Sequence, residues 1–302
     1  MISGVEFGVN LYRFPHMPDA GFPETVEFVK KAEALGFAQV RLVDHVVGIV
    51  AERHGGIAQT PYTDKSVIRE CFTLMSYLSA VTSKIRFVPA VMGIPARQTA
   101  LVAKQAAEVD IMSGGRLVMG VSVGYNPLEF EALGADFKTR GKRFEEQVVL
   151  LRQLWTERDV SFTGEFHSMQ DVSLSPRPVQ RPIPLFFGMG RAIAPIPPDV
   201  VLRRVGRMAD GWFPIFGPTP EGKVALQTMR DAAREAGRDP DSIIMDQSAA
   251  MGSKSADELR DTILALRDFG AKRITFGIEG DNFAAHMDGL DRLRGMLDAM
   301  ND

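Results

Sequence analysis

The chain has 302 residues, a formal net charge of −3 and 45% apolar residues, values that suit one (β/α)8 barrel with a large buried core. The nearly balanced charge argues against nucleic acid as a partner, and no uncharged stretch is long and apolar enough to span a bilayer. The single cysteine, Cys71, rules out an internal disulfide and fits a reducing compartment. With no signal-peptide pattern at the N-terminus, the sequence predicts a cytoplasmic protein.

Short apolar runs of strand character alternate along the chain with segments of helical periodicity. The predicted strands are, in order, 5–10, 39–43, 85–91, 116–121, 184–187, 212–215, 242–247 and 273–277. Alternation of this kind is typical of parallel strands joined by crossover helices. Eight such units predict one α/β domain over residues 1–302, a (β/α)8 TIM barrel.

Two long segments interrupt this alternation, one after the second predicted strand and one after the fourth. The first covers residues 46–69. The second covers roughly 122–183 and contains a predicted helix over 142–155 and a predicted hairpin over 160–166, turning at Thr163 and Gly164. Long insertions between a strand and its helix usually form lids or substrate walls. We therefore expect both insertions to border the active site.

The second predicted strand ends in an acid and a histidine, Asp44 and His45. The carboxyl ends of the strands of a parallel barrel face the active-site mouth. Histidine exchanges a proton near neutral pH, and a neighbouring carboxylate can hold the edge of a cofactor or a donor group of the substrate. We interpret both as candidate catalytic residues. The alternative is a capping aspartate beside a surface histidine.

Two further segments with small residues follow later strands. Gly188, Met189 and Gly190 follow the fifth predicted strand, where glycine lets backbone N–H groups approach a phosphate. Asn126 ends the segment 120–126 after the fourth strand, whose small side chains leave room for a planar ligand. An ordinary tight turn and a flexible exit loop, respectively, are the alternatives.

Other common sites are not supported by the sequence. It contains neither a GxGxxG dinucleotide fingerprint nor a P-loop. The five histidines show no short metal-binding spacing and Cys71 stands alone, so we predict no metal. The absence of a G-x-S-x-G elbow disfavours a serine hydrolase.

A collinear set of short segments carries a family resemblance. They are FGVN (7–10), AEALGF (32–37), VDHV (43–46), LSAVT (78–82), AKQAA (103–107), SGGRL (113–117), EFEALG (129–134), SPRPVQRP (175–182) and ADGW (209–212). In this order they resemble the bacterial luciferase-like flavin and deazaflavin oxidoreductases. The branch that uses coenzyme F420, a deazaflavin, is the most similar.

The resemblance implies a cofactor ring at the C-terminal mouth of the barrel. By position, Asp44 and His45 would lie against the ring and the substrate. Ala90 and Val91 fall where the family has a non-prolyl cis peptide in the third strand, behind the ring. Asn126 matches a contact to the ring edge or the ribityl chain. The loop that takes the cofactor phosphate matches Gly188, Met189 and Gly190.

We therefore expect an oxidoreductase that transfers a hydride between coenzyme F420 and a small organic substrate. The protein would orient the ring and supply an acid or base, for which His45 is the candidate. The alternatives are an FMN-dependent monooxygenase on the same fold and a non-catalytic flavin-binding protein, between which the fold cannot choose. Homodimers are common in this family and among soluble enzymes, which makes a homodimer the candidate assembly.

Overall fold

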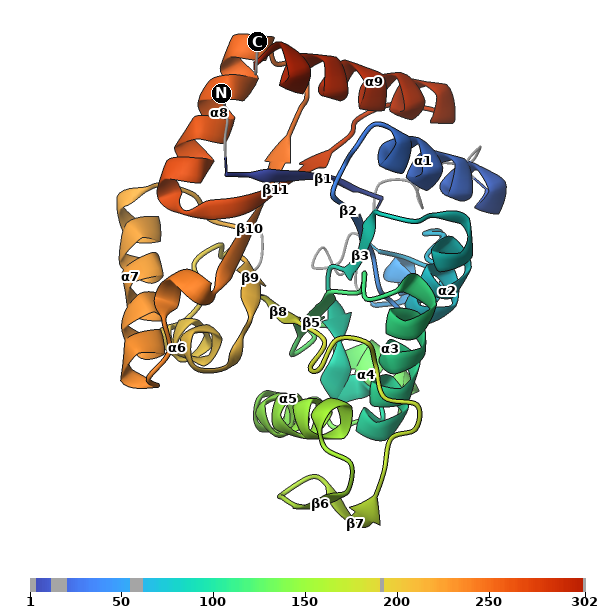
Figure 1. Ribbon diagram of the computed structural model, residues 1–302, viewed down its shortest axis with the longest axis vertical. Coiled ribbons are helices and arrows are strands. Elements are labelled where there is room, and N and C mark those ends of the chain that lie inside the picture. The colour runs from blue at the N-terminus through green and yellow to red at the C-terminus, as the bar shows by residue number, and fades with distance from the viewer. Residues whose placement is uncertain (1–3, 12–20, 55–61, 191–192, 301–302) are drawn as a thin grey trace. The chain divides into compact units, whose positions relative to one another are not determined.

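The computed structural model describes residues 4–11, 21–54, 62–190 and 193–300, in which strands and helices alternate (Figure 1). The strands are β1 (Glu6–Asn10), β2 (Gln39–Leu42), β3 (Arg86–Pro89), β4 (Met92–Gly93), β5 (Met119–Ser122), β6 (Val160–Thr163), β7 (Ser168–Val172), β8 (Leu185–Gly188), β9 (Gly211–Phe213), β10 (Ile244–Ala250) and β11 (Ala271–Gly277). The α-helices are α1 (Phe22–Ala34), α2 (Cys71–Val81), α3 (Thr99–Ser113), α4 (Pro127–Ala132), α5 (Arg140–Thr156), α6 (Asp199–Met208), α7 (Pro220–Glu235), α8 (Ala256–Phe269) and α9 (Phe283–Ala299). Three short 3-10 helices are η2 (Ala51–His54), η3 (Ile94–Ala96) and η4 (Pro240–Ser242).

Nine strands form one sheet in the order β3-β2-β1-β11-β10-β9-β8-β5-β4. The strand pairs with a described register in this sheet are all parallel. Parallel strands separated by helices confirm the predicted (β/α)8 barrel class. The predicted third strand is divided in the structure into β3 and β4, and the ninth strand results from this division.

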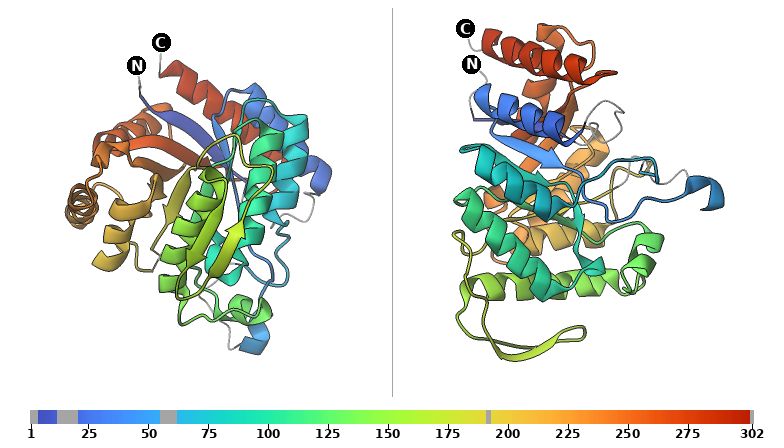
Figure 2. Two further views of the ribbon diagram at one scale, coloured as in Figure 1. Left: turned by 60° about the horizontal axis from the view of Figure 1, so that its bottom comes forward. Right: turned by 90° about the vertical axis from the view of Figure 1, so that its right-hand side faces the viewer.

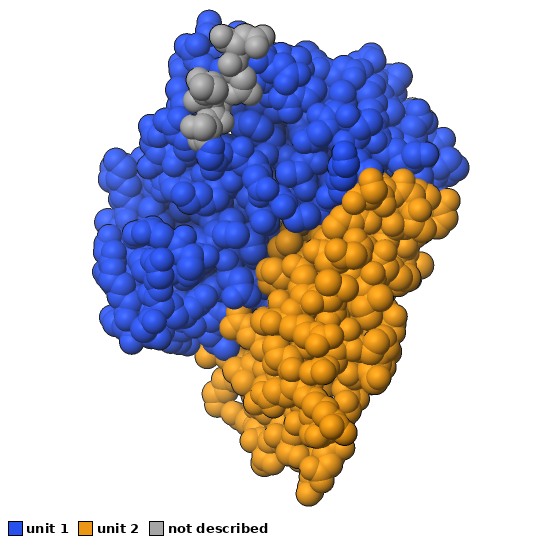
Figure 3. All heavy atoms as spheres, viewed as in Figure 1, with its two compact units in different colours: residues 1–41, 84–86, 185–302 blue, residues 42–83, 87–184 orange. Residues whose placement is uncertain are grey.

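Contacts between residues divide the chain into two compact units (Figure 3). The first unit consists of residues 1–41, 84–86 and 185–302, and the second of residues 42–83 and 87–184. Each unit contains both strands of the sheet and helices. Among the described residues, no helix is both long and apolar enough to cross a membrane.

The first unit packs its helices around the parallel strands β1, β8, β9, β10 and β11 and most of β2. Helix α1 lies beside α9, α6 beside α7, and α8 beside α9 (Figure 1). The strands of this unit carry fully buried apolar residues such as Trp212, Ile274 and Phe276. Helix α8 begins with a capping box between Ser255 and Glu258, which satisfies two of the free N–H groups at its start.

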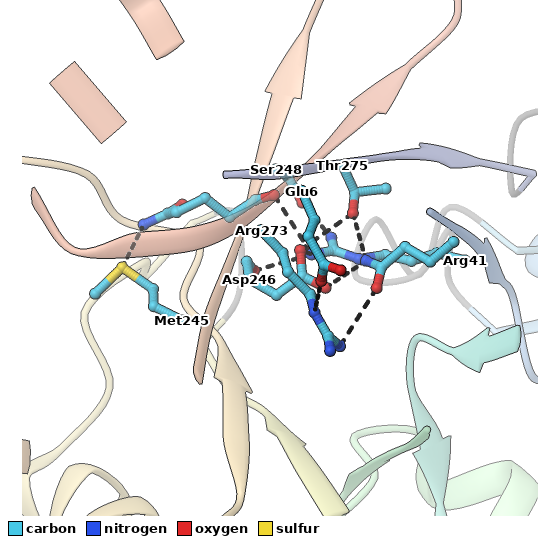
Figure 4. Close-up of polar contacts among 9 residues, drawn as sticks. Glu6, Arg41, Met245, Asp246, Ser248, Arg273 and Thr275 are labelled. Carbon is cyan, nitrogen blue, oxygen red and sulfur yellow. Dashed lines mark hydrogen bonds and ion pairs between the residues drawn. The ribbon is translucent and has the colours of Figure 1, made fainter. Parts of the chain in front are cut away.

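A buried polar network also lies among the strands of the first unit (Figure 4). The guanidinium of Arg41 in β2 forms an ion pair with Asp246 in β10, and both side chains are almost completely buried. Arg41 also donates to Ser248 Oγ over 2.7 Å, and Thr275 Oγ1 donates to Asp246 Oδ1 over 3.1 Å. These hydrogen bonds offset part of the cost of burying two charges. The polar residues Gln39, Arg41 and Asp246 are thus buried, whereas Ser248 is exposed.

The second unit contains α2, α3 and α5 and the separate hairpin of β6 and β7. Helix α3 packs on α2 and α5, and the fully buried Trp155 of α5 donates from Nε1 to the Ala103 carbonyl over 3.0 Å. Helix α3 ends at Gly114, which has the left-handed φ of +67° that glycine adopts without strain. The hairpin lies beside α5 (Figure 2).

The insertion after the fourth predicted strand contains the expected helix and hairpin, but the hairpin begins and ends elsewhere. Its antiparallel strands are β6 and β7, and the turn between them spans 164–167, where Gly164 N–H donates to the His167 carbonyl over 2.8 Å. The predicted hairpin, which ended at residue 166, therefore missed its second strand. Strand β7 is polar and gives no apolar signal in the sequence. In the insertion after β2, Ile49 pairs with Thr63, and residues 55–61 lie outside the described part.

Candidate active site

A cavity in the second unit opens at the carboxyl ends of β2, β4 and β5. Its walls come from three segments: residues 43–46 after β2 together with Tyr62, residues 90–97 around β4, and residues 122–133 after β5. Asp44, His45, Ala90 and Val91, four of the predicted site residues, line this one cavity. The structure thus brings together residues that are up to 47 positions apart in the sequence (91 − 44 = 47).

His45 is held between two partners that the sequence analysis did not single out. Its Nδ1 lies 3.0 Å from Glu129 Oε2, and its Nε2 lies 3.2 Å from the Tyr125 hydroxyl. The ring of Tyr62 packs against the imidazole, with ring centroids 4.7 Å apart. A carboxylate only accepts, so the neutral imidazole donates from Nδ1–H to Glu129. Its Nε2 is then the acceptor, and this nitrogen is the atom available for proton transfer.

Asp44 lies deeper and is paired with a cation. Arg97 Nη2 donates to both carboxylate oxygens, over 2.8 and 2.9 Å, and the Asp44 side chain is only 4% exposed. Nearby, the buried Cys71 thiol donates to the Val43 carbonyl over 3.7 Å, and burial raises the pKa of this thiol well above its usual value. Cys71 is therefore a neutral packing residue and not a nucleophile.

The two carboxyl groups of the cavity differ in how readily they ionise. Burial raises the pKa of Asp44, and the positive charge and hydrogen bonds of Arg97 offset this only in part. Burial also acts to raise the pKa of Glu129, but the hydrogen bond and charge of His45 and the Val46 N–H outweigh it, so the pKa is lowered. Glu129 is therefore a firm anion beside the imidazole, whereas the charge on Asp44 depends on Arg97.

The peptide bond between Ala90 and Val91 is cis, as the family resemblance implies. It lies between β3 and β4, and Ala90 N–H donates to the Leu42 carbonyl over 2.7 Å. Small residues also line the next part of the wall. A Cβ on Gly93 would lie 3.5 Å from Gly124 Cα, and one on Gly124, whose φ is +75°, would lie 2.6 Å from the Phe130 ring. Gly124 is therefore required by the close approach of the Phe130 ring and by its own positive φ.

The remaining predicted residues lie elsewhere. Asn126 is buried, and its Oδ1 accepts the Leu128 N–H over 3.1 Å, so its side chain caps helix α4 and is not among the residues lining the cavity. Gly188, Met189 and Gly190 belong to the first unit, at the end of β8. Their predicted roles toward a ring edge or a phosphate stay predictions.

Gly190 is required by its own loop. Its φ is +77°, and a Cβ there would lie 2.6 Å from the Pro195 carbonyl oxygen and 3.0 Å from the Ile215 side chain. Any other residue would disturb the loop itself. A substitution at Gly190 is therefore a poor test of phosphate binding, because it changes the backbone along with any ligand contact.

The sequence contained weak signals for the residues that were missed. Glu129 lies within the matching segment EFEALG, and Tyr125 directly precedes the candidate Asn126, but neither follows a strand immediately. Arg97 lies in the short link between η3 and α3 and resembles an ordinary surface arginine. Among the described residues, no group of three or more His, Cys, Asp and Glu side chains is arranged to hold a metal ion.

Known proteins resemble this chain in sequence and in fold. A family model described as luciferase-like monooxygenase matches residues 6–294. An uncharacterized Mycobacterium bovis protein is 33% identical over 221 residues, covering 70% of this chain and 72% of that protein.

Relatives with a stated activity include two cofactor types. A coenzyme F420-dependent glucose-6-phosphate dehydrogenase of Segniliparus rotundus is 30% identical over 230 residues, covering 69% of this chain and 63% of that protein. An FMNH2-dependent dimethylsulfone monooxygenase of Pseudomonas putida is 33% identical over 156 residues, covering 51% and 41%.

Among solved structures, a coenzyme F420-dependent secondary alcohol dehydrogenase in complex with an F420-acetone adduct superposes with a TM-score of 0.74. It covers 99% of both chains at 18% identity, which supports the fold alone.

Proposed function

The chain belongs to the luciferase-like monooxygenase family, and we propose that it is an oxidoreductase that transfers a hydride between coenzyme F420 and a small organic substrate. The observation that carries this proposal is the position of His45. Its Nδ1 is bound by Glu129, and its Nε2 faces the Tyr125 hydroxyl in a cavity backed by Ala90 and Val91. Hydride transfer to or from an alcohol or carbonyl requires a proton to move as well, and this imidazole can accept or donate it.

The cavity fits a flat ring. Val43, Ala90 and Val91 give it an apolar wall, and Gly93 and Gly124 line the cavity beside that wall without a side chain of their own. Polar groups that converge on such a wall are typical of a cofactor site. A bound deazaflavin would supply a carbon centre that accepts or gives up a hydride.

The chain's own residues have separable roles in this proposal. Glu129 fixes the imidazole tautomer and its orientation, so that His45 Nε2 can take or return the substrate proton. Tyr125 donates to that nitrogen in the absence of a substrate hydroxyl. Asp44, held by Arg97, would contact the polar edge of the ring.

An FMN-dependent monooxygenase is the second candidate, and the Pseudomonas putida relative supports it. Fluorescence titration of the protein, purified from a host that makes no F420, distinguishes the two. We expect F420 to bind more tightly than FMN and the loaded protein to exchange a hydride with an alcohol or carbonyl. Tight FMN binding with oxygen consumption would instead support the monooxygenase. Tight ring binding without turnover over a broad substrate panel would support a non-catalytic flavin-binding protein.

A further inference from the structure

The hairpin of the second insertion is attached to the body of the second unit through a histidine. His167, at the end of the turn before β7, lies with Nδ1 2.6 Å from Glu146 Oε1 and with Nε2 2.6 Å from Thr99 Oγ1. Its side chain is only 10% exposed. Glu146 also accepts the backbone N–H groups of Glu165 and Phe166, over 2.7 and 3.0 Å. The turn is therefore bound to α5 and α3 at one point.

These contacts have a definite direction. The Glu146 carboxylate can only accept, so His167 donates from Nδ1–H. The neutral ring then accepts at Nε2 from the Thr99 hydroxyl, which in turn accepts from Gln147 Nε2 over 2.8 Å. His167 and Thr99 each donate one hydrogen bond on one side and accept one on the other, an arrangement in which neighbouring hydrogen bonds strengthen one another.

Gln147 connects this chain to the candidate active site. It is completely buried in α5, and its amide nitrogen lies 3.1 Å from the Ile94 carbonyl and 3.3 Å from the Arg97 carbonyl. Its Oε1 has no hydrogen-bond partner among the described residues. The amide therefore has its donor end toward the acceptors, since the reverse orientation would bring oxygen against two carbonyls. Arg143 is a second and longer donor to the Arg97 carbonyl, at 3.5 Å.

The same Arg97 binds Asp44 in the cavity. A continuous path thus runs from His167 through Thr99 and Gln147 to the backbone of Arg97, and from its side chain to Asp44. We propose that Gln147, Thr99 and His167 are positioning residues that hold Arg97 against Asp44. The consequence for catalysis rests on the proposed function, whereas the effect on Asp44 itself can be measured without cofactor or substrate.

A merely structural attachment would have a different signature. It would stabilise the fold equally at all pH values. If Gln147 holds Arg97, the loss of Gln147 weakens the ion pair that stabilises the ionised Asp44. The acid dissociation constant of Asp44 should then fall on the order of tenfold, which corresponds to one pKa unit. The charged and titratable groups that act on Asp44 are Arg97, Glu129 and its neighbour His45, and the thiol of Cys71 feels its charge.

The experiment measures the unfolding free energy of the cofactor-free protein between pH 4 and pH 8, for wild type and Gln147→Met. A carboxyl with a raised folded-state pKa contributes stability at low pH that is lost as pH rises through that pKa. The unfolding free energy of Gln147→Met should therefore lie further below that of wild type at pH 8 than at pH 4. In an Asp44→Asn background, this pH dependence of the difference should disappear.

Three further variants keep the test decisive if Gln147→Met folds poorly. Thr99→Val removes the hydroxyl at nearly constant shape and should show a smaller pH-dependent loss, which Thr99→Ser restores. Val149→Ala changes an exposed and uncharged residue of α5, so it should lower stability equally at both pH values, if at all. A pH-independent loss in Gln147→Met and Thr99→Val, or a pH-dependent one that persists without Asp44, would overturn the proposal.

Discussion

Glu129 Oε2 and His45 Nδ1 lie 3.0 Å apart, although the two residues are separated by 84 positions in the chain. The other oxygen of the same carboxylate accepts the Val46 N–H over 2.6 Å. One side chain on α4 thus fixes both the imidazole and the backbone that carries it. The orientation of the candidate proton-transfer group therefore depends on the helix that follows β5.

Glu129→Gln should lower the rate of hydride transfer by about 10- to 100-fold, the usual cost of removing a carboxylate that orients a histidine. The amide can still occupy the site, but it no longer selects the tautomer with Nδ1–H. Single-turnover kinetics with saturating cofactor measures this rate. Glu131→Gln, at an exposed position of the same helix, is the matched control and should leave the rate unchanged.

His45→Ala should lower turnover by about 10²- to 10⁴-fold, the range for loss of a general acid or base, with little change in the cofactor dissociation constant. If His45 is only a wall contact, the dissociation constant should rise while single-turnover transfer survives. Measuring both in one variant separates the roles. A preserved transfer rate would remove His45 from the catalytic residues.

The sequence predicted what depends on local pattern. Alternating apolar runs indicated the strands, because each strand carries its own run of apolar residues. The segment VDHV and the position of Ala90 and Val91 indicated one wall of the site. The partners of these residues could not be predicted, because Glu129 and Arg97 reach His45 and Asp44 only through tertiary packing. The polar β7 was missed for a similar reason, since its pairing with β6 and not its own hydrophobicity defines it.

The buried ion pair of the first unit yields a stability prediction. Asp246→Asn would leave the Arg41 guanidinium buried without its counter-charge, which typically costs about 3–5 kcal/mol. Arg41→Met combined with Asp246→Leu should recover much of this loss, because the pair is then replaced by apolar groups of similar volume. Urea denaturation at neutral pH measures all three proteins. If Asp246→Asn is as stable as wild type, water reaches the ion pair of Arg41 and Asp246.

The lowered pKa of Glu129 predicts how its contribution to stability depends on pH. Burial opposes ionisation, but His45, Val46 and Arg97 favour the anion more strongly, so the folded-state pKa lies below the unfolded one. Such a group stabilises the fold above its unfolded-state pKa, near 4.3 for glutamate, and this contribution is lost as pH falls through the folded-state value. Glu129→Gln should therefore be less stable than wild type at pH 7, with the difference shrinking below about pH 4. Denaturation curves of the cofactor-free protein at pH 7, 5 and 3.5 test this against Glu131→Gln. A difference that stays constant down to the lowest pH would show that Glu129 contributes through packing and not through its charge.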